Sequence, residues 1–356
     1  MDVKIRYIKK NELQKLVSFN RANYRAGHIL TDKKYLDWQF GAFPSSLQNY
    51  TVLGVFNGRN DLLGVFGLTF LNYLYFGKKV RCTSLANLMV DKKLRNLGLG
   101  YLLLRKAEEL NAITLDHGLN QDATRLFLGK GWVGENLQRY AFVFNSAHIK
   151  KVIKNRSAAL TNSVRPVVSP GGLVFVRLKQ YDQRLKIFFK KLQKKYPITV
   201  DRSKEYLNWR YFKHPLISYH LFAAFEGKAV RSFAVVRIDG PAYFKVGRII
   251  DFVSFDEAEK FSLLNVVDFC RAQAVHFVDY YFSGTFHGKS LPAAGFVDCS
   301  RGAYAFLPKA LNPVVTGGKT SINFFVTTNG EKECKKARSL KNWYTTKGGG
   351  DQDRAY

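Results

Sequence analysis

The chain has 356 residues, and a hydrophobic content of 46% is typical of a globular protein and excludes a disordered one. This length predicts two domains, each large enough to bury a core of its own. The net charge of +29 predicts an anionic partner, whether a phosphorylated small molecule, a nucleic acid or an anionic membrane face.

The N-terminal region has no apolar stretch of signal-peptide length, so we expect a cytoplasmic protein. The most apolar window, residues 62–77, is interrupted by Gly64, Gly67, Thr69 and Asn72. It is shorter than the roughly 20 apolar residues of a membrane span, and we interpret it as two adjacent strands. The 4 cysteines and 7 histidines follow no metal-ligand spacing, which predicts free thiols and no metal site.

A duplicated segment first appears early in the chain. Residues 35–44 read YLDWQFGAFP, and residues 206–215 read YLNWRYFKHP. An aspartate precedes each copy, Asp32 and Asp201, at a position where it would cap a helix. Strand-like runs, tight turns and a later Gly-aromatic pair follow in the same order in both halves. The repeat is too long for a solenoid unit and predicts two whole domains of one fold.

The order of helical and strand patterns in each half predicts an α+β fold, with a mixed, mostly antiparallel sheet flanked by helices. We place the first domain at 1–147, a connecting segment at 148–180 and the second domain at 181–328. Pro166, Pro170 and two glycines mark the connection, and a polar tail follows at 329–356. The basic run 184–195 has apolar residues at helical spacing. A membrane-surface helix stays open, but an ordinary amphipathic helix is the simpler interpretation.

A glycine-containing turn joins an apolar strand to a helix in the segment 84–110. The strand covers residues 85–90, the turn reads RNLGLG at 95–100, and an apolar-periodic helix begins near Gly98. The first N–H groups of a helix have no partner within the helix and favour an anion. Because Gly98 and Gly100 lack a Cβ, a phosphate group could approach these amides closely.

This turn resembles the acyl-CoA signature of the GNAT superfamily of N-acyltransferases, Arg/Gln-x-x-Gly-x-Gly/Ala after a strand. The stretch NQDATRLFLGKGW at 120–132 is similar to a later motif of the same superfamily. The resemblance implies two tandem GNAT-like domains and acetyl-CoA as acyl donor. It also implies a coenzyme site formed by Leu88, Met89, Val90, Arg95, Asn96, Leu97, Gly98, Leu99, Gly100, Asn120, Ala123 and Phe127.

Two departures from the superfamily pattern matter. Phe127 stands where the family often has a tyrosine that protonates the leaving thiolate, and phenylalanine has no ionisable group. In the second half, the equivalent stretch 249–267 has no glycine and carries Asp256, Glu257 and Glu259. We therefore expect the first domain alone to bind the coenzyme, and the second domain to shape the acceptor pocket or the interface.

Three residues, Asp116, His117 and Asp251, are candidates for catalysis. The strand within 112–120 would expose Asp116 and His117 at its C-terminal end beside the thioester, as the resemblance implies. The ordinary pKa of histidine suits a general base. Asp251 occupies the equivalent late-strand position of the second half. A structural role is the competing interpretation for all three residues.

The segment Tyr-x-x-Trp-x-Tyr/Phe with its following proline, and the tail GGGDQDR at 348–354, are similar to tandem GNAT proteins associated with bacterial surface-polysaccharide biosynthesis. This implies an N-acetyltransferase whose acceptor is a small amine, phosphorylated or nucleotide-linked, and most plausibly an amino sugar. The intact coenzyme turn argues against a nucleic acid partner. Peripheral membrane contact, protein N-acetylation and any oligomeric state stay open. So do a tRNA-dependent peptidoglycan-type aminoacyltransferase and a non-catalytic acyl-CoA-binding protein.

Overall fold

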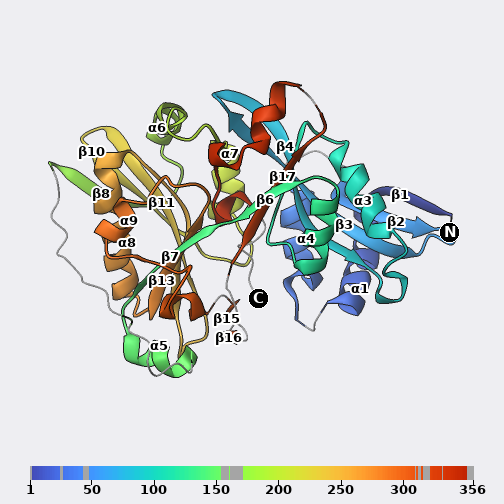
Figure 1. The fold of residues 1–356 in the computed structure, drawn as a ribbon, viewed down its shortest axis with the longest axis horizontal. Coiled ribbons are helices and arrows are strands. Elements are labelled where there is room, and N and C mark those ends of the chain that lie inside the picture. The colour runs from blue at the N-terminus through green and yellow to red at the C-terminus, as the bar shows by residue number, and fades with distance from the viewer. Residues whose placement is uncertain are drawn as a thin grey trace.

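The computed structural model describes residues 2–24, 27–42, 48–153, 160, 171–308, 310–311, 314–315, 321–330 and 332–350. Two large sheets lie side by side, one in each half of the molecule (Figure 1). Both sheets are mixed, mostly antiparallel and flanked by helices, so the predicted α+β class with two GNAT-like domains is confirmed.

The first sheet belongs mainly to the N-terminal half. Its strands follow the order β1 (Val3–Lys9), β2 (Asn49–Asn57), β3 (Leu62–Tyr75), β4 (Lys78–Val90), β5 (Ile113–His117), β17 (Asn323–Thr328) and β6 (Val133–Asn136). Strand β9 (Ile198–Val200) pairs with the end of β3 and with β18 (Trp343–Tyr344). The helices of this half are α1 (Leu13–Asn23), α2 (Lys33–Leu36), α3 (Leu99–Glu108) and α4 (Gln121–Gly129).

The second sheet has the order β14 (Val297–Asp298), β7 (Gln138–Val143), β13 (Phe277–Phe282), β12 (Val246–Ser254), β11 (Ala229–Asp239), β10 (His220–Glu226) and β8 (Leu173–Leu178). Its helices are α5 (Ser146–Ile153), α6 (Arg184–Leu192), α7 (Lys204–Leu207), α8 (Asp256–Ala272) and α9 (Ser290–Ala293). Strands β15 (Ala310–Leu311) and β16 (Val314–Val315) form a separate small hairpin.

The two halves exchange a strand. Strand β7 comes from the N-terminal half but pairs with β13 and β14 in the second sheet, and β17 returns from the C-terminal half to lie between β5 and β6. Figure 1 shows this exchange as a red strand within the blue-to-green half. Each sheet therefore needs the other half of the chain to be complete. The domain boundaries expected from the sequence stay predictions. The strand exchange links the two domains in a way that those boundaries did not include.

The duplicated segments adopt matching structures. Each begins with a short helix, α2 or α7, that continues into a π-helical turn, at Asp37–Gly41 and Asn208–Phe212 respectively. Asp32 caps α2 by accepting a hydrogen bond from the Tyr35 N–H at 2.9 Å, as predicted. The cap of α7 is Ser203, so the prediction for Asp201 is wrong. Ser203 is the residue in register with Asp32, and Asp201 instead pairs with Lys79.

Three further expectations need correction. Most of the apolar window at 62–77 forms one long strand, β3, because Gly64 and Gly67 lie within the strand and do not turn the chain. Strand β8 lies inside the predicted connecting segment and is an edge strand of the second sheet. Pro166 and Pro170 lie outside the described residues. The predicted polar tail is wrong for residues 343–349, which pack into the interior.

The largest hydrophobic core contains residues of both halves, including the buried tail. Helix α6 contributes Leu185, Phe188 and Leu192 to it and is an ordinary amphipathic helix, with its lysines outside. Within the described residues, no helix is long and apolar enough to cross a membrane. Nor do three or more metal-ligating side chains gather anywhere in that part of the chain.

Candidate functional site

The predicted glycine turn has the conformation that an anion site needs. Strand β4 ends at Val90, a short 3-10 turn covers Lys92–Leu94, and α3 begins at Leu99. Gly98 has a φ of 77°, in the left-handed region that L-residues rarely adopt. A Cβ built on Gly98 would meet no atom within 4 Å, so it would project into open space.

The N-terminus of α3 has no side-chain cap. The N–H groups of its first turn therefore remain available to a ligand, and the positive end of the helix dipole lies at the same place. Arg95 is exposed at the edge of this turn. Backbone donors, helix dipole and guanidinium together fit a pyrophosphate.

A cavity of about 540 Å³ opens directly in front of this turn. Three elements line it: the end of β4, the turn with the first residues of α3, and the first turns of α4. Its lining residues are Leu88, Met89, Val90, Leu94, Arg95, Asn96, Gly98, Leu99, Gly100, Tyr101, Asn120, Asp122, Ala123, Arg125 and Leu126. We call this cavity the α3 pocket.

Most residues expected from sequence at a coenzyme site line the α3 pocket, but two do not. Leu97 is 57% exposed and points to solvent. Phe127 is completely buried on the inner face of α4, where its ring packs against Trp132 with centroids 4.6 Å apart. Phe127 is therefore a core residue, because α4 buries this face against the sheet.

The structure also adds residues that the sequence did not single out. Tyr101 and Arg125 line the pocket from α3 and α4, one and two helical positions away from predicted residues. Leu126 also lines the pocket. It belongs to the motif at 120–132 and lies three residues after Ala123, so helical spacing could have suggested it. Asn87 has a φ of 61°, and asparagine in a strand is a signal for such a left-handed position.

Strands β4 and β5 separate beside the α3 pocket. Their parallel pairing runs from Cys82 with Ile113 to Leu85 with Asp116 and then ends. On the other edge of β4 the register with β3 shifts between Ala86 and Met89, so Asn87 lies in a β-bulge. The backbone of β4 beyond Leu85 is thus exposed on the side where β5 departs. A thioester carbonyl could be bound there.

The opposite face of this bulge carries a small void of about 10 Å³ lined by Asn20, Asn87 and apolar residues. Asn20 is 2% exposed, and its Nδ2 donates to the Leu30 carbonyl at 2.7 Å. Its Oδ1 accepts no hydrogen bond from the described part of the chain. A buried acceptor without a donor is costly, so this void is suited to a polar hydrogen-donating group.

His117 is the last residue of β5, but the C-terminal segment covers it. Its ring is 2% exposed, and its Nε2 lies 2.9 Å from the Thr345 hydroxyl oxygen. Gly350 packs against the imidazole so closely that a Cβ there would clash. Burial lowers the pKa of His117 to about 3, so the imidazole is neutral at physiological pH. This environment does not favour a general base.

Asp116 points to the other face of β5. In β17 it pairs with Phe325, which belongs to the apolar cluster beneath α3 and α4, whereas His117 pairs with Phe324 of the main core. Directly paired residues project to the same side of a sheet. Asp116 therefore projects from the face of the sheet on which the α3 pocket lies. The side chain of His117 projects from the opposite face.

Asp251 lies in the second sheet and is engaged in a buried ion pair. Its carboxylate accepts two hydrogen bonds from the Arg202 guanidinium, both 2.8 Å long, and a third from the Thr346 hydroxyl at 3.2 Å. A bidentate arginine pair fixes the orientation of a carboxylate. The structure thus does not bring Asp251 together with the other two candidates.

The second half differs from the first at the place equivalent to the α3 pocket. Helix α8 begins at Asp256, and its first turn carries Glu257 and Glu259 where a coenzyme phosphate would bind. Glu259 is 2% exposed and ion-paired with Lys195, and its carboxylate also contacts His287 at 3.1 Å. Negative charge at this helix N-terminus would repel a phosphate.

Neither a protein-family model nor a curated protein sequence matches this chain. Solved structures do. A GCN5-related N-acetyltransferase from Anabaena variabilis is 10% identical, with a TM-score of 0.58 over 92% of this chain and 73% of that one. Saccharomyces cerevisiae N-myristoyltransferase with bound myristoyl-CoA is 12% identical, with a TM-score of 0.55 over 91% and 82%.

A second GCN5-related N-acetyltransferase, from Kribbella flavida, is 13% identical, with a TM-score of 0.57 over 92% of this chain and 71% of that one. At such identities the likeness establishes the fold alone. The chain therefore shares the fold of these N-acetyltransferases and of this N-myristoyltransferase.

Proposed function

We propose that the chain is an acyl-CoA-dependent N-acyltransferase that binds its donor, acetyl-CoA, in the α3 pocket. The observation that carries this proposal is the N-terminus of α3. It follows Gly98 in the chain, has no side-chain cap and opens onto a cavity of about 540 Å³. The pyrophosphate would bind the first-turn amides of α3. The pantetheine arm would follow the end of β4, from Val90 to Leu88, toward the separation of β4 and β5.

Transfer requires an amine nitrogen to attack the thioester carbonyl, a donor for the oxyanion, and departure of the thiolate. The backbone of β4 at the Asn87 bulge lies where the oxyanion would form. A thiolate is a good leaving group, with a pKa near the cysteine reference of about 8.5. The reaction therefore does not depend on a tyrosine at position 127.

The proton of the amine needs an acceptor, and the three candidates differ in how well they fit. Asp116 lies on the face of the sheet that the donor occupies, whereas His117 is buried beneath Gly350 and Asp251 is held by Arg202. We infer that Asp116 fits the role of general base best.

The acceptor is, in our proposal, a nucleotide-linked or otherwise phosphorylated amino sugar used in surface-polysaccharide biosynthesis. The support is the net charge of +29, which raises the local concentration of an anionic substrate. Such steering weakens with added salt, because the screening length is about 10 Å at 0.1 M.

The test is an acetyl-transfer assay that compares nucleotide-linked amino sugars with the matching free sugars, lysine peptides and polyamines at low and high salt. We expect the nucleotide-linked sugars to have the highest kcat/KM and the strongest salt dependence. Higher kcat/KM for peptides or polyamines, or no effect of phosphate on the acceptor, would refute the amino-sugar assignment.

One observation favours a second candidate, a non-catalytic acyl-CoA-binding protein. Phe127 provides no acid at the position where the superfamily often has one, and the buried C-terminal segment covers His117. Binding of acetyl-CoA without transfer to any amine in the same assay would establish this alternative.

A further inference from the structure

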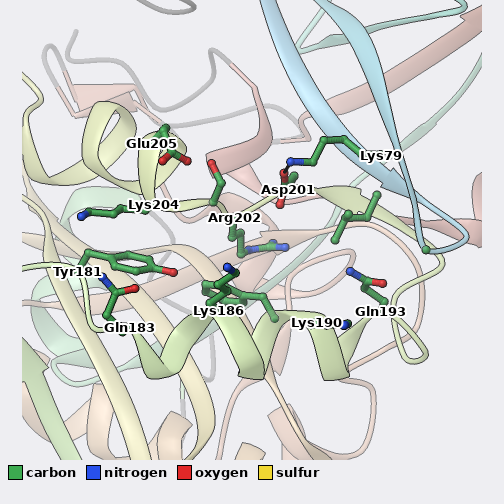
Figure 2. A pocket seen from close by; sticks show the side chains of 14 residues that line it. Lys79, Tyr181, Gln183, Lys186, Lys190, Gln193, Asp201, Arg202, Lys204 and Glu205 are labelled. Carbon is green, nitrogen blue, oxygen red and sulfur yellow. Dashed lines mark ion pairs between the residues drawn. The ribbon is translucent and has the colours of Figure 1, made fainter.

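A second cavity, of about 560 Å³, lies where the two halves of the chain meet. We call it the seam pocket. One wall is the turn between β3 and β4, with Lys79, and the other walls are α6 and the segment from Asp201 into α7. Figure 2 shows these side chains around the opening, with Lys186 and Lys190 on α6 and Lys204 on α7.

Backbone hydrogen bonds hold the two walls together. The Phe76 N–H donates to the Pro197 carbonyl at 2.7 Å, and the Asp201 N–H donates to the Asn72 carbonyl at 2.8 Å. Lys79 reaches across the junction to the Asp201 carboxylate at 2.7 Å. The seam pocket is thus a preformed cavity with fixed walls, and it exists only when the two halves are docked.

The lining is strongly cationic. Within the described part of the chain, the exposed Lys186, Lys190 and Lys204 take part in no ion pair. Two acidic residues also line the pocket. Asp201 is already neutralised by Lys79, and Glu205 is next to Lys204 in the chain. Three lysines without an ion pair in the described part of the chain therefore line one cavity, from two of its walls.

Helix α6 carries two of these lysines on one face. Its buried face consists of Leu185, Phe188 and Leu192, which places Lys186 and Lys190 one turn apart on the pocket side. Like charges at this spacing destabilise an isolated helix. A bound anion between them would offset that repulsion.

Other groups of the lining can donate hydrogen bonds. Burial, and then the negative charges of Glu205, Asp182 and Asp201, raise the pKa of Tyr181, so its hydroxyl stays protonated. Figure 2 shows this hydroxyl pointing into the cavity. Gln183 and Gln193 add side-chain amides. Ammonium, hydroxyl and amide donors together suit several phosphate oxygens.

The seam pocket is separate from the α3 pocket. Lys79 and Val90 lie near opposite ends of β4, and at about 3.3 Å per residue they are about 36 Å apart along the strand. A pantetheine arm that begins at Gly98 does not enter the seam pocket. The acceptor amine, which must meet the thioester, does not lie there either.

We propose that the seam pocket is a second ligand site, which binds a small molecule carrying a pyrophosphate group. Its cations occupy two facing walls, and its volume exceeds that of a single phosphate. The ligand is either inorganic pyrophosphate or the diphosphate of a nucleotide. A concave cavity of this size suits a small molecule better than a flat basic surface would.

The experiment is calorimetric titration of pyrophosphate and of UDP into protein whose α3 pocket is blocked by Gly98→Glu. We expect one site per chain. The double variant Lys186→Gln/Lys190→Gln should bind the tighter of the two ligands at least about tenfold more weakly. The matched control is Lys191→Gln/Lys194→Gln, which removes equal charge from residues that do not line the pocket.

Tighter binding of UDP than of pyrophosphate, together with weakening by Tyr181→Phe, would identify a nucleotide. Equal binding would identify the phosphates as the recognised group. The proposal is overturned if neither ligand binds at millimolar concentration, if the control variant loses as much affinity, or if anionic lipid vesicles alone bind. Because the readout is binding with the α3 pocket blocked, its outcome does not depend on acyl transfer.

Discussion

Trp38 and Trp209 donate hydrogen bonds to each other's backbone. The Trp38 Nε1–H donates to the Trp209 carbonyl at 2.9 Å, and the Trp209 Nε1–H donates to the Trp38 carbonyl at 3.0 Å. Their rings stack with centroids 5.0 Å apart. These are the tryptophans of the two duplicated segments, so the repeat seen in the sequence is also the contact that joins the halves.

We predict that Trp38→Phe and Trp209→Phe destabilise the protein by similar amounts. Each leaves a buried carbonyl without its donor, which costs about 1–3 kcal/mol. Urea unfolding of the single and double variants would give the coupling energy, expected to be at least about 0.5 kcal/mol because the residues are in contact. Tyr243→Phe, at a side chain 68% exposed, is the control. Additive losses would show that the two bonds form independently.

Phe127→Tyr should change stability more than catalysis. The new hydroxyl would enter the apolar cluster beneath α3 and α4, where it has no evident partner, at a cost of about 1–3 kcal/mol. The acyl-transfer rate should stay within about tenfold, a barrier change of about 1.4 kcal/mol. A much larger gain in rate with an accepted amine would show that a missing acid limits this protein.

The sequence was sufficient to predict the fold class because periodicity and capping are local. The turn at Gly98, the strand before it and the helix after it were all expected, and they form the α3 pocket. The exchange of β7 and β17 could not be predicted, since it depends on pairing between residues far apart in the chain, more than two hundred positions for β5 with β17. The amino-acid sequences of β7 and β17 give no sign that these strands pair outside their own half of the chain.

The burial of the C-terminal segment escaped prediction for a related reason. Gly348, Gly349 and Gly350 give no hydrophobic signal, yet they fit against Tyr211, Thr345 and His117, where a Cβ would clash. Backbone carbonyls there also accept hydrogen bonds from buried side chains, such as Tyr206 to Gly348 at 2.6 Å. Burial of a polar backbone depends on partners that only the folded chain supplies.

His117 should make the protein sensitive to acid. Its folded pKa of about 3 lies below the ordinary value of 6.5, so the unfolded chain binds a proton first as the pH falls. Stability is therefore unaffected well above pH 6.5 and is lost as the pH falls from 6.5 toward 3. The loss amounts to at most about 1.4 kcal/mol per pH unit.

The variant His117→Gln keeps a polar group near Thr345 but does not titrate. Urea unfolding at pH 7.5, 5.5 and 4.5 should show a smaller acid loss in this variant than in the native chain. In the transfer assay, the rate should show no His117-dependent inflection near pH 6.5. If kcat falls below pH 6.5 in the native chain, and this limb disappears in the variant, His117 is the general base after all.

The central claim is that the first half alone binds acyl-CoA, through the turn before α3. The most direct measurement is calorimetric titration of acetyl-CoA into the native chain, Gly98→Glu and Gly227→Glu. Gly227 is a matched control, because it has a positive φ of 55° and open space around a built Cβ, but it lies in the turn between β10 and β11. Both substitutions should therefore strain the backbone to a similar degree.

The native chain and Gly227→Glu should each bind one acetyl-CoA per chain. Gly98→Glu should bind none, because its side chain enters the α3 pocket and its carboxylate repels the pyrophosphate. In thermal unfolding, ligand at 100 times its Kd should stabilise the first two proteins by about 2.7 kcal/mol and leave Gly98→Glu unchanged. Two equivalent sites per chain, or undiminished binding by Gly98→Glu, would contradict the account.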